Sequence, residues 1–428
     1  MQAAPAEETQ VLHPSDIALN LTSLPAEERQ QLWQSLSSEQ QGEVIPYVSE
    51  SVKQTLLEAM DSEAIRLATS GMEVGDIAEV MELVEDDVAQ EIFDSLSEGD
   101  QTQLKRSLEF DEDESGRLLD YEGLSVTRHR TAGQVLNHIK KVGMPEYCDL
   151  IFLVGKQQSF LGALTLASVL EASEDTPLAD IPTIDIDTID PNLPTSDLAR
   201  LFRQKYYVSL PVVDSDGRLL GRITLDDAMD VMQEEADHQL MGMAGLPEEE
   251  DLFAPVMQSA RKRAVWLGIN LLTALLASWV IGLFEATLEQ VVALAVLMPL
   301  VASMGGIAGS QTLTLTIRGL ALGQISNSNQ RALLRKEMAV GLCNGAFWAV
   351  GVAAVAYAWF QDPLLSLVLA LAVFVNVLAA AFSGILVPVV LEKLKIDPAL
   401  AGSVVLTTVT DVVGFFAFLG LGSLWLVG

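Results

Sequence analysis

One acidic residue near the C-terminus lies inside a long apolar stretch. Asp411 falls within residues 406–414, which are otherwise apolar apart from threonines and one glycine. A carboxylate at membrane depth costs a few kcal/mol unless it is paired, hydrated or bound to a cation. Thr407 and Thr408 precede it by one helical turn, so the three side chains form a polar strip. The pattern favours an aqueous cation path, with a buried structural acid as the alternative.

A second group of acidic residues gathers in the middle of the chain. Like charges this close repel one another, so the arrangement is destabilising unless cations neutralise it. Carboxylates with almost no His or Cys beside them suit Mg2+ or Ca2+ better than zinc or copper. Metal binding is therefore expected to tighten this region. The group consists of Asp226, Asp227, Asp230, Glu234, Glu235 and Asp237.

A third acidic pattern has a plainer explanation. Asp87, Glu91 and Asp94 recur at spacings of four and three, so they share one face of a predicted helix. A solvated charged face is the usual meaning of such a pattern.

These residues belong to two parts of opposite character. The chain of 428 residues has a net charge of -33, yet half of its residues are hydrophobic. Residues 1–260 hold 51 acidic and 16 basic side chains, whereas residues 261–428 hold 7 and 9. A single globular domain rarely combines such values, so an acidic part is joined to an apolar one. Residues 1–15 lack a basic start and an apolar run, so the acidic part is expected to stay in the cytosol.

The apolar part contains five stretches long enough to cross a bilayer, which takes about 20 residues. Basic residues precede the first stretch and lie in the connections between the second and third and between the fourth and fifth. With five spans, all of these positions fall on the side of the N-terminus, which is the positive-inside pattern of a cytosolic N-terminus. The C-terminus is then expected outside. The stretches lie near 264–284, 290–317, 338–360, 363–391 and 399–427.

The second apolar stretch contains a proline and clustered glycines. Pro299 and the glycines at 305, 306 and 309 loosen a helix and let another backbone approach closely. Helix packing through small residues explains the glycines equally well. Three asparagines of the apolar part likewise either face the predicted path or join helices by hydrogen bonds: Asn270, Asn344 and Asn376.

An internal repeat precedes the apolar part. Residues 147–170 match residues 207–229, with Tyr147 aligned to Tyr207, and each copy reads as strand, turn, strand and helix. The two copies resemble tandem CBS domains, which generally sense ligands and do not catalyse reactions. Upstream, residues 15–118 read as short amphipathic helices stacked as hairpins.

Several motifs of the apolar part occur in a fixed order. They are Met298-Pro299-Leu300, Gly-Gly-x-Ala-Gly-Ser-Gln-Thr at 305–312, Arg335-Lys336-Glu337-Met338, Asp397-Pro398-Ala399 and Thr410-Asp411. Together with the preceding helical part and repeat, they resemble the MgtE family of magnesium channels over nearly the whole chain.

The resemblance implies a multi-domain membrane protein with an all-α helical-repeat domain, an α/β tandem CBS pair, a connecting helix and five transmembrane helices. The expected boundaries are 1–14 for a disordered N-terminus, 15–118 for the acidic helical domain, 119–190 and 191–238 for the two CBS domains, 239–262 for the connecting plug helix and 263–428 for the pore domain.

The resemblance further implies a homodimer in the inner membrane that takes up Mg2+ through a path at its two-fold interface. Cytosolic Mg2+ would close this path by bridging the acidic domains, and no nucleic acid is an expected partner. The implied path residues are Asp411, Pro299, Ala302, Gly305, Gly306, Thr407 and Thr408. The implied metal ligands are Asp411 in the path and Asp87, Glu91, Asp227, Asp230 and Glu235 in the sensor. An adenine nucleotide such as ATP is a further ligand, for Thr224 and Asp227.

The sequence leaves some alternatives open. No phosphate-cradling loop is present to power a pump, so no enzymatic activity is expected. An ion-coupled carrier for Mn2+ or Co2+ and a membrane-tethered CBS sensor without transport remain possible functions. The family often has Asn where Ile307 stands, and acids where His238 and Gln239 stand, so details of the path and the number of regulatory ions stay open.

Overall fold

The computed structural model describes residues 13–145, 147–246, 251–326 and 328–427. These residues divide into two compact units, one of Met1–Glu235 with Glu249–Ala254, the other of Ala236–Glu248 with Pro255–Gly428. The disordered N-terminus predicted at 1–14 falls almost entirely outside the described residues.

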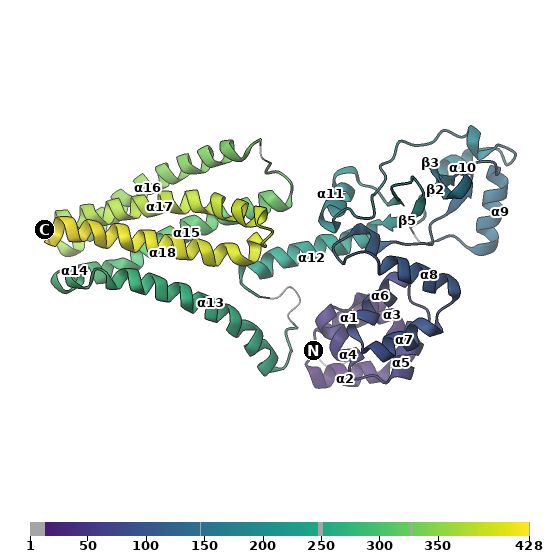
Figure 1. Cartoon of the computed structure of the whole chain (residues 1–428), viewed down its shortest axis with the longest axis horizontal. Helices are drawn as coiled ribbons and strands as arrows, with labels where there is room; N and C mark the ends of the chain where they lie inside the picture. The colour runs from purple at the N-terminus through teal and green to yellow at the C-terminus, as the bar shows by residue number, and fades with distance from the viewer. Residues whose placement is uncertain (1–12, 146, 247–250, 327, 428) are drawn as a thin grey trace. The chain divides into compact units, whose positions relative to one another are not determined.

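Eight short helices make up the described N-terminal part of the first unit (Figure 1). Alternate helices contact each other, α1 with α3, α3 with α5 and α5 with α7, so the helices stack as hairpins. One apolar core runs through them and includes the fully buried Leu21, Trp33 and Ile92. The predicted helical repeat is confirmed. The helices are α1 (Pro14–Thr22), α2 (Ala26–Ser35), α3 (Ser38–Val44), α4 (Glu50–Leu57), α5 (Ser62–Thr69), α6 (Val74–Leu83), α7 (Asp86–Ser95) and α8 (Glu98–Ser107).

Two small α/β modules complete the first unit. The first has a sheet of order β1-β2-β3, in which β1 is parallel to β2 and β2 antiparallel to β3. The second has the antiparallel pair β4-β5. The elements are β1 (Ser125–Thr127), α9 (Ala132–Val142), β2 (Leu150–Val154), β3 (Phe160–Thr165), α10 (Leu166–Glu171), α11 (Thr195–Lys205), β4 (Ser209–Val213), β5 (Leu219–Thr224) and α12 (Leu225–Met243).

The strand registers show that the two modules are copies of one design. Leu150 pairs with Thr165 in the first copy and Ser209 with Thr224 in the second, and both pairs carry an irregularity before the last residue of the first strand. The predicted CBS pair is confirmed. The sequence alignment of Tyr147 with Tyr207 is one residue out of register, because the structure matches Leu150 with Ser209; the counterpart of Tyr147 is Tyr206, and both have a positive φ.

Five helices of the described chain are long and apolar enough to cross a membrane. The most buried is α17, which contacts α15, α16 and α18, while α13 contacts α18 (Figure 1). The five helices are α13 (Val256–Gly282), α15 (Val292–Ala321), α16 (Gln330–Phe360), α17 (Pro363–Lys393) and α18 (Pro398–Gly422, with a π-helical extension Ser423–Val427); the short α14 (Glu285–Gln290) follows α13.

The ends of these helices follow from local sequence. Prolines open α17 and α18, and the preceding Asp362 and Asp397 accept hydrogen bonds from the first free backbone N–H groups. The helices α13 and α16 begin about eight residues before the predicted apolar stretches, because the basic residues there continue each helix beyond its apolar part.

The connection at 239–262 differs from the single helix predicted there. The helix α12 ends at Met243, and α13 begins at Val256. Gly245 takes a left-handed conformation (φ +68°), and Pro255 is extended before α13, so the helix is interrupted on both sides. Residues 247–250 of this connection lie outside the described residues.

A buried ion pair joins the end of this connection to the N-terminal helices. The Arg29 guanidinium of α2 donates to both carboxylate oxygens of Asp251, at 2.7 and 2.8 Å. It also donates to the carbonyls of Leu21 and Leu24. The two charged side chains are only 2% and 7% exposed. Residues 251–254 are therefore fixed to the first unit immediately before α13 begins.

Removing the Asp251 carboxylate is expected to destabilise the N-terminal helices. Asp251→Ala should lower their free energy of unfolding by about 3–5 kcal/mol, because Arg29 is left buried without a counter-charge. Hydrogen exchange at α1 and α2 in the full-length protein measures this. The exposed pair of Arg66 and Glu63 is the control, and Glu63→Ala should cost less than about 1 kcal/mol. Equally small losses in both variants would contradict the prediction.

Candidate functional site

Asp411 lies within two residues of the middle of the 30-residue apolar segment Pro398–Val427. Its side chain is half-buried, and it forms no hydrogen bond or ion pair with any residue that the structure describes. The hydroxyls of Thr407 and Thr408, one turn earlier, donate to the carbonyls of Ser403 and Val404. The oxygen lone pairs of both threonines therefore remain available as acceptors.

Glycines set the position of α15 against α18. A Cβ at Gly309 would lie 3.0 Å from Leu406, one at Gly402 3.1 Å from Leu313, and one at Gly414 3.2 Å from Val301. These three contacts share one antiparallel register. In that register Asp411 lies level with residue 304, beside the glycine pair at 305 and 306.

The predicted path residues of α15 therefore flank the level of Asp411. Pro299 is exposed, Ala302 and Gly306 are half-buried, and Gly305 is buried. A Cβ at Gly306 would meet nothing within 4 Å, so this position borders open space in a single chain. The Asp411 carboxylate, the threonine oxygens one turn before it and the open position at Gly306 therefore lie at similar heights along α15 and α18. Such a set of oxygen acceptors suits a hydrated cation.

The three asparagines separate into two groups. Asn270 and Asn344 are exposed on the outside of the described helices. Asn376 is fully buried, and its Nδ2 donates to the Val301 carbonyl at 2.9 Å. Of the two roles left open for Asn376, the structure supports the joining of helices.

A second acid of the membrane unit is buried and was not among the predicted site residues. Glu337 of α16 is 5% exposed, accepts a hydrogen bond from the Thr312 hydroxyl and pairs with Lys336 at 2.7 Å. Because Glu337 follows Arg335 and Lys336, the sequence assigns it to the basic connection between the second and third apolar stretches. Its helical phase, one turn before the buried Gly341, was the available signal.

In the first unit, acids of α12 and α6 come together. Burial raises the pKa of Asp76 to about 7, with the charges of Glu79, Asp227 and Asp230 adding to it and Lys53 opposing it. Burial likewise raises the pKa of Asp227 to about 6, against two hydrogen bonds from Thr224. The pKa of Asp230 is raised by burial and by Asp226 and Glu79.

This acidic cluster, defined as Asp76, Glu79, Asp226, Asp227 and Asp230, is electrostatically strained. Among the described residues no three acidic, His or Cys side chains are arranged to ligate one ion directly. One oxygen of Asp226 is buried without a hydrogen-bond partner. The donor set therefore fits a cation that keeps its water shell, as Mg2+ does, better than one that requires a closed cage.

Other predicted sensor residues lie elsewhere. Asp87 and Glu91 are on α7, where Glu91 acts on Arg66, and neither is among the charges that act on Asp227 or Asp230. Glu235 lies further along α12 and is half-buried. No local sequence pattern predicted a role for Asp76 and Glu79, because α6 comes close to α12 only through tertiary packing.

The predicted nucleotide residues form a helix-capping pair. The Thr224 hydroxyl and backbone N–H both donate to one Asp227 oxygen, at 2.6 and 3.0 Å. Within the second unit, His238 contacts Asp397 at 3.1 Å, and Met243 packs against an apolar cluster that includes Ala399 of α18. The C-terminal end of α12 is therefore anchored where α18 begins.

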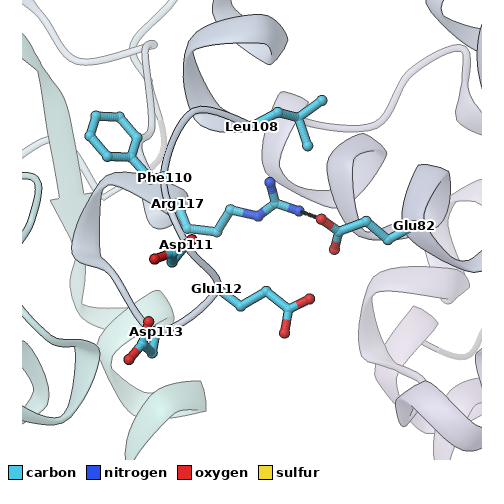
Figure 2. A pocket seen from close by; sticks show the side chains of 7 residues that line it. All are labelled: Glu82, Leu108, Phe110, Asp111, Glu112, Asp113 and Arg117. Carbon is cyan, nitrogen blue, oxygen red and sulfur yellow. Dashed lines mark hydrogen bonds and ion pairs between the residues drawn. The ribbon is translucent and has the colours of Figure 1, made fainter.

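A surface hollow of about 470 Å³ lies in the first unit beside the loop after α8. Figure 2 shows Arg117 reaching across it to pair with Glu82, with Asp111, Glu112 and Asp113 on the loop. It contains none of the predicted site residues.

Three family profiles match the chain in sequence order. The MgtE profile, described as a divalent cation transporter, matches residues 298–421. The MgtE intracellular N domain matches 12–113, and a CBS domain matches 178–234. The chain belongs to the MgtE family. It is therefore a multi-pass membrane protein and a transporter of divalent cations, not an enzyme.

Relatives in the MgtE family align along nearly their whole length. The magnesium transporter MgtE of Bacillus subtilis is 24% identical over 96% of this chain and 92% of its own. That of Thermus thermophilus is 28% identical over 97% and 93%. A solved cytosolic domain of the Mg2+ channel MgtE, in complex with ATP, covers 53% of this chain and 93% of its own, at 24% identity and a TM-score of 0.49.

The raised pKa values predict a pH dependence of this MgtE-family protein. Protons are bound more tightly at Asp76 and Asp227 when they are packed together than when they are separated. Their contribution to stability is therefore fully present below about pH 4 and is lost as the pH rises through about 6–7. Without divalent ions, the protection factors at α6 and the start of α12, which are the intrinsic exchange rates at each pH divided by the observed rates, should fall from pH 5 to pH 8.

Two variants check the cause of this pH dependence. Asp76→Asn should reduce it, because the amide does not ionise. Part of it should remain, because burial also raises the pKa of Glu73 to about 7 and that of Asp227 to about 6. The pKa of Asp187 is lowered by hydrogen bonds from Lys205 and Tyr207, so Asp187→Asn should leave the pH dependence between 5 and 8 unchanged. Protection factors that are independent of pH in the unsubstituted protein would contradict the prediction.

Proposed function

We propose that this protein is a Mg2+ channel for uptake across the cell membrane, closed by Mg2+ bound to its cytosolic part. Magnesium transport is supported by the named relatives, which align over 92–93% of their own lengths. The observation that carries the channel mechanism is Asp411, a half-buried carboxylate at mid-membrane without a described partner. Such a group requires water or a cation.

The proposed path runs between two copies of the chain. Asp411, Thr407 and the surface of Gly306 are open to the surroundings in one chain, and an exposed polar strip facing lipid is unfavourable. A second copy, related by two-fold symmetry, would cover the strip and add its own Asp411. Two carboxylates suit a divalent ion that gives up its water reluctantly. Pro299, Ala302, Gly305 and Thr408 would complete the walls at this level.

The proposed regulation acts through the acidic cluster of α6 and α12. Mg2+ bound there through its water shell would offset the repulsion between Asp76 and Asp227 that burial intensifies. The same helix α12 reaches, at its C-terminal end, the start of α18, the helix that carries Asp411. Binding at one end of α12 is thereby linked to the path.

The orientation and a second ligand belong to the same proposal. Basic residues near the starts of α13 and α16 and around the connection from α17 to α18 favour a cytosolic N-terminus and an outer C-terminus. Thr224 and Asp227 are proposed for an adenine nucleotide at the CBS pair. Since Asp227 also belongs to the acidic cluster, nucleotide and Mg2+ would influence each other there.

Loss of the Asp411 carboxylate is expected to abolish Mg2+ flux. At an effective dielectric constant of about 20, one carboxylate attracts an adjacent unit charge by about 4 kcal/mol. Asp411→Ala in proteoliposomes should therefore reduce Mg2+ flux by about a hundredfold or more. Glu289→Gln, which removes an exposed acid outside the apolar segments, is the control and should conduct normally.

Two outcomes would redirect the proposal. Unchanged flux in Asp411→Ala would favour the membrane-tethered sensor without transport. Flux that saturates slowly and requires a stoichiometric counter-ion would favour the ion-coupled carrier. Parallel assays with Mn2+, Co2+ and Ca2+ identify the preferred ion.

Loss of sensor acids is expected to leave conduction intact and weaken closure. Asp227→Ala with Asp230→Ala should shift the internal Mg2+ concentration for half-closure upward by about tenfold or more, because each lost charge removes attraction for the ion. Asp76→Ala with Glu79→Ala should act in the same direction. Flux at controlled internal Mg2+ measures both.

The helix α7 supplies the matched control for the sensor. Asp87→Ala with Glu91→Ala also removes two acids from the first unit, but these do not act on Asp227 or Asp230. If only this variant shifts the internal Mg2+ concentration for half-closure, the sensor lies on α7 and not in the acidic cluster. Unaltered closure in all three double variants would remove the acidic cluster as the sensor.

A further inference from the structure

Asn376 lies at the crossing of the two helices that carry the proposed path. It belongs to α17, is fully buried and donates from Nδ2 to the Val301 carbonyl of α15 at 2.9 Å. Val301 follows Pro299 by two residues. The opposite orientation of the amide would set its oxygen against the Val301 oxygen, so the chemistry fixes the donor on this side.

Two glycines leave the space that Asn376 occupies. A Cβ at Gly305 of α15 would lie 2.1 Å from Asn376 Nδ2, and one at Gly414 of α18 would lie 2.6 Å from the same atom. Both distances are far below van der Waals contact, so neither position accepts a side chain while Asn376 is present. The amide thus acts as a spacer between α15 and α18, next to Asp411.

A packing role alone does not explain the choice of residue. Asn376 Oδ1 is buried and has no hydrogen-bond partner among the described residues. A buried amide oxygen left without a donor is destabilising, whereas Leu has a similar size and no such group to satisfy. The polar side chain is therefore retained despite a loss of stability.

We infer that Asn376 is a positioning residue of the ion path. It holds the backbone of α15 around Val301 and Gly305 at a fixed separation from α18 at Gly414, and so sets the distance between Asp411 and the glycine surface. This inference rests on the proposed function, in which that level conducts Mg2+. Asn376 acts through the two helices and does not itself contact the ion.

Replacement of Asn376 tests the inference. Asn376→Leu keeps the size and removes the donor, and Asn376→Ser is the smaller variant that keeps a donor. Asn376→Leu should change the half-saturating Mg2+ concentration or the Mg2+ to Ca2+ flux ratio by about tenfold, with the amount of folded protein retained. Asn376→Ser should lie between it and the unsubstituted protein. The control is Ser383→Ala, a buried polar residue of the same helix, which should leave both quantities unchanged.

A double substitution separates positioning from general stability. Gly414→Ala alone brings a methyl group against Asn376 and should impair flux. Adding Asn376→Ala removes the obstacle and should restore flux about tenfold relative to Gly414→Ala. This readout applies even if Asn376→Leu fails to fold, because both chains of the comparison carry the same Gly414→Ala change.

The failure of this inference is distinguishable from failure of the proposed function. Independent effects of the two substitutions, or unchanged selectivity and half-saturation in folded Asn376→Leu, would overturn the positioning role while Asp411 still proves essential. An unsubstituted protein that passes no Mg2+ would instead overturn the proposed function itself.

Discussion

A single carboxylate at mid-membrane constrains the rest of the membrane unit. Asp411 cannot be left in hydrocarbon without water or a counter-charge. Among the described residues it has no hydrogen-bond or ion-pair partner, and in the proposed function water and the transported cation take that place. Glycines at the contacts between α15 and α18 set a register in which it lies level with residue 304, beside Gly305 and Gly306. Close helix packing accounts for Gly309, Gly402 and Gly414, whereas Gly306 meets nothing within 4 Å in a single chain.

The first unit also contains buried carboxylates, but here several of them are packed against one another. Asp76 and Asp227 are packed closely enough for burial and like charge to raise both pKa values toward neutrality. Folding alone leaves this repulsion uncompensated, apart from Lys53, which pairs with Glu79 at 2.6 Å. In the proposed regulation, a bound Mg2+ would supply the missing opposite charge.

The features that could be predicted from the sequence are those that depend on the residues of a single helix or strand. The five apolar helices, the helical repeat and the depth of Asp411 each follow from local periodicity, length and composition. The pairing of α6 with α12 does not, since Asp76 and Asp227 are far apart in the chain and their helices meet only through tertiary packing. Asp87 and Glu91 show the same regular spacing as a binding face, and nothing local distinguishes them from Asp76 and Glu79. The break between α12 and α13 was visible in Gly245 and Pro255, but the general order of the family outweighed these local signals.

The ion pair of Arg29 and Asp251 gives that break a structural meaning. Separating the pair would leave Arg29 buried and unpaired, so residues 251–254 remain bound to the N-terminal helices. The helix α13 starts two residues later, after Pro255, whose fixed φ limits the bending of the connection. The interruption between α12 and α13, at Gly245 and Pro255, leaves residues 251–254 outside any helix, and Asp251 forms the buried pair with Arg29 there.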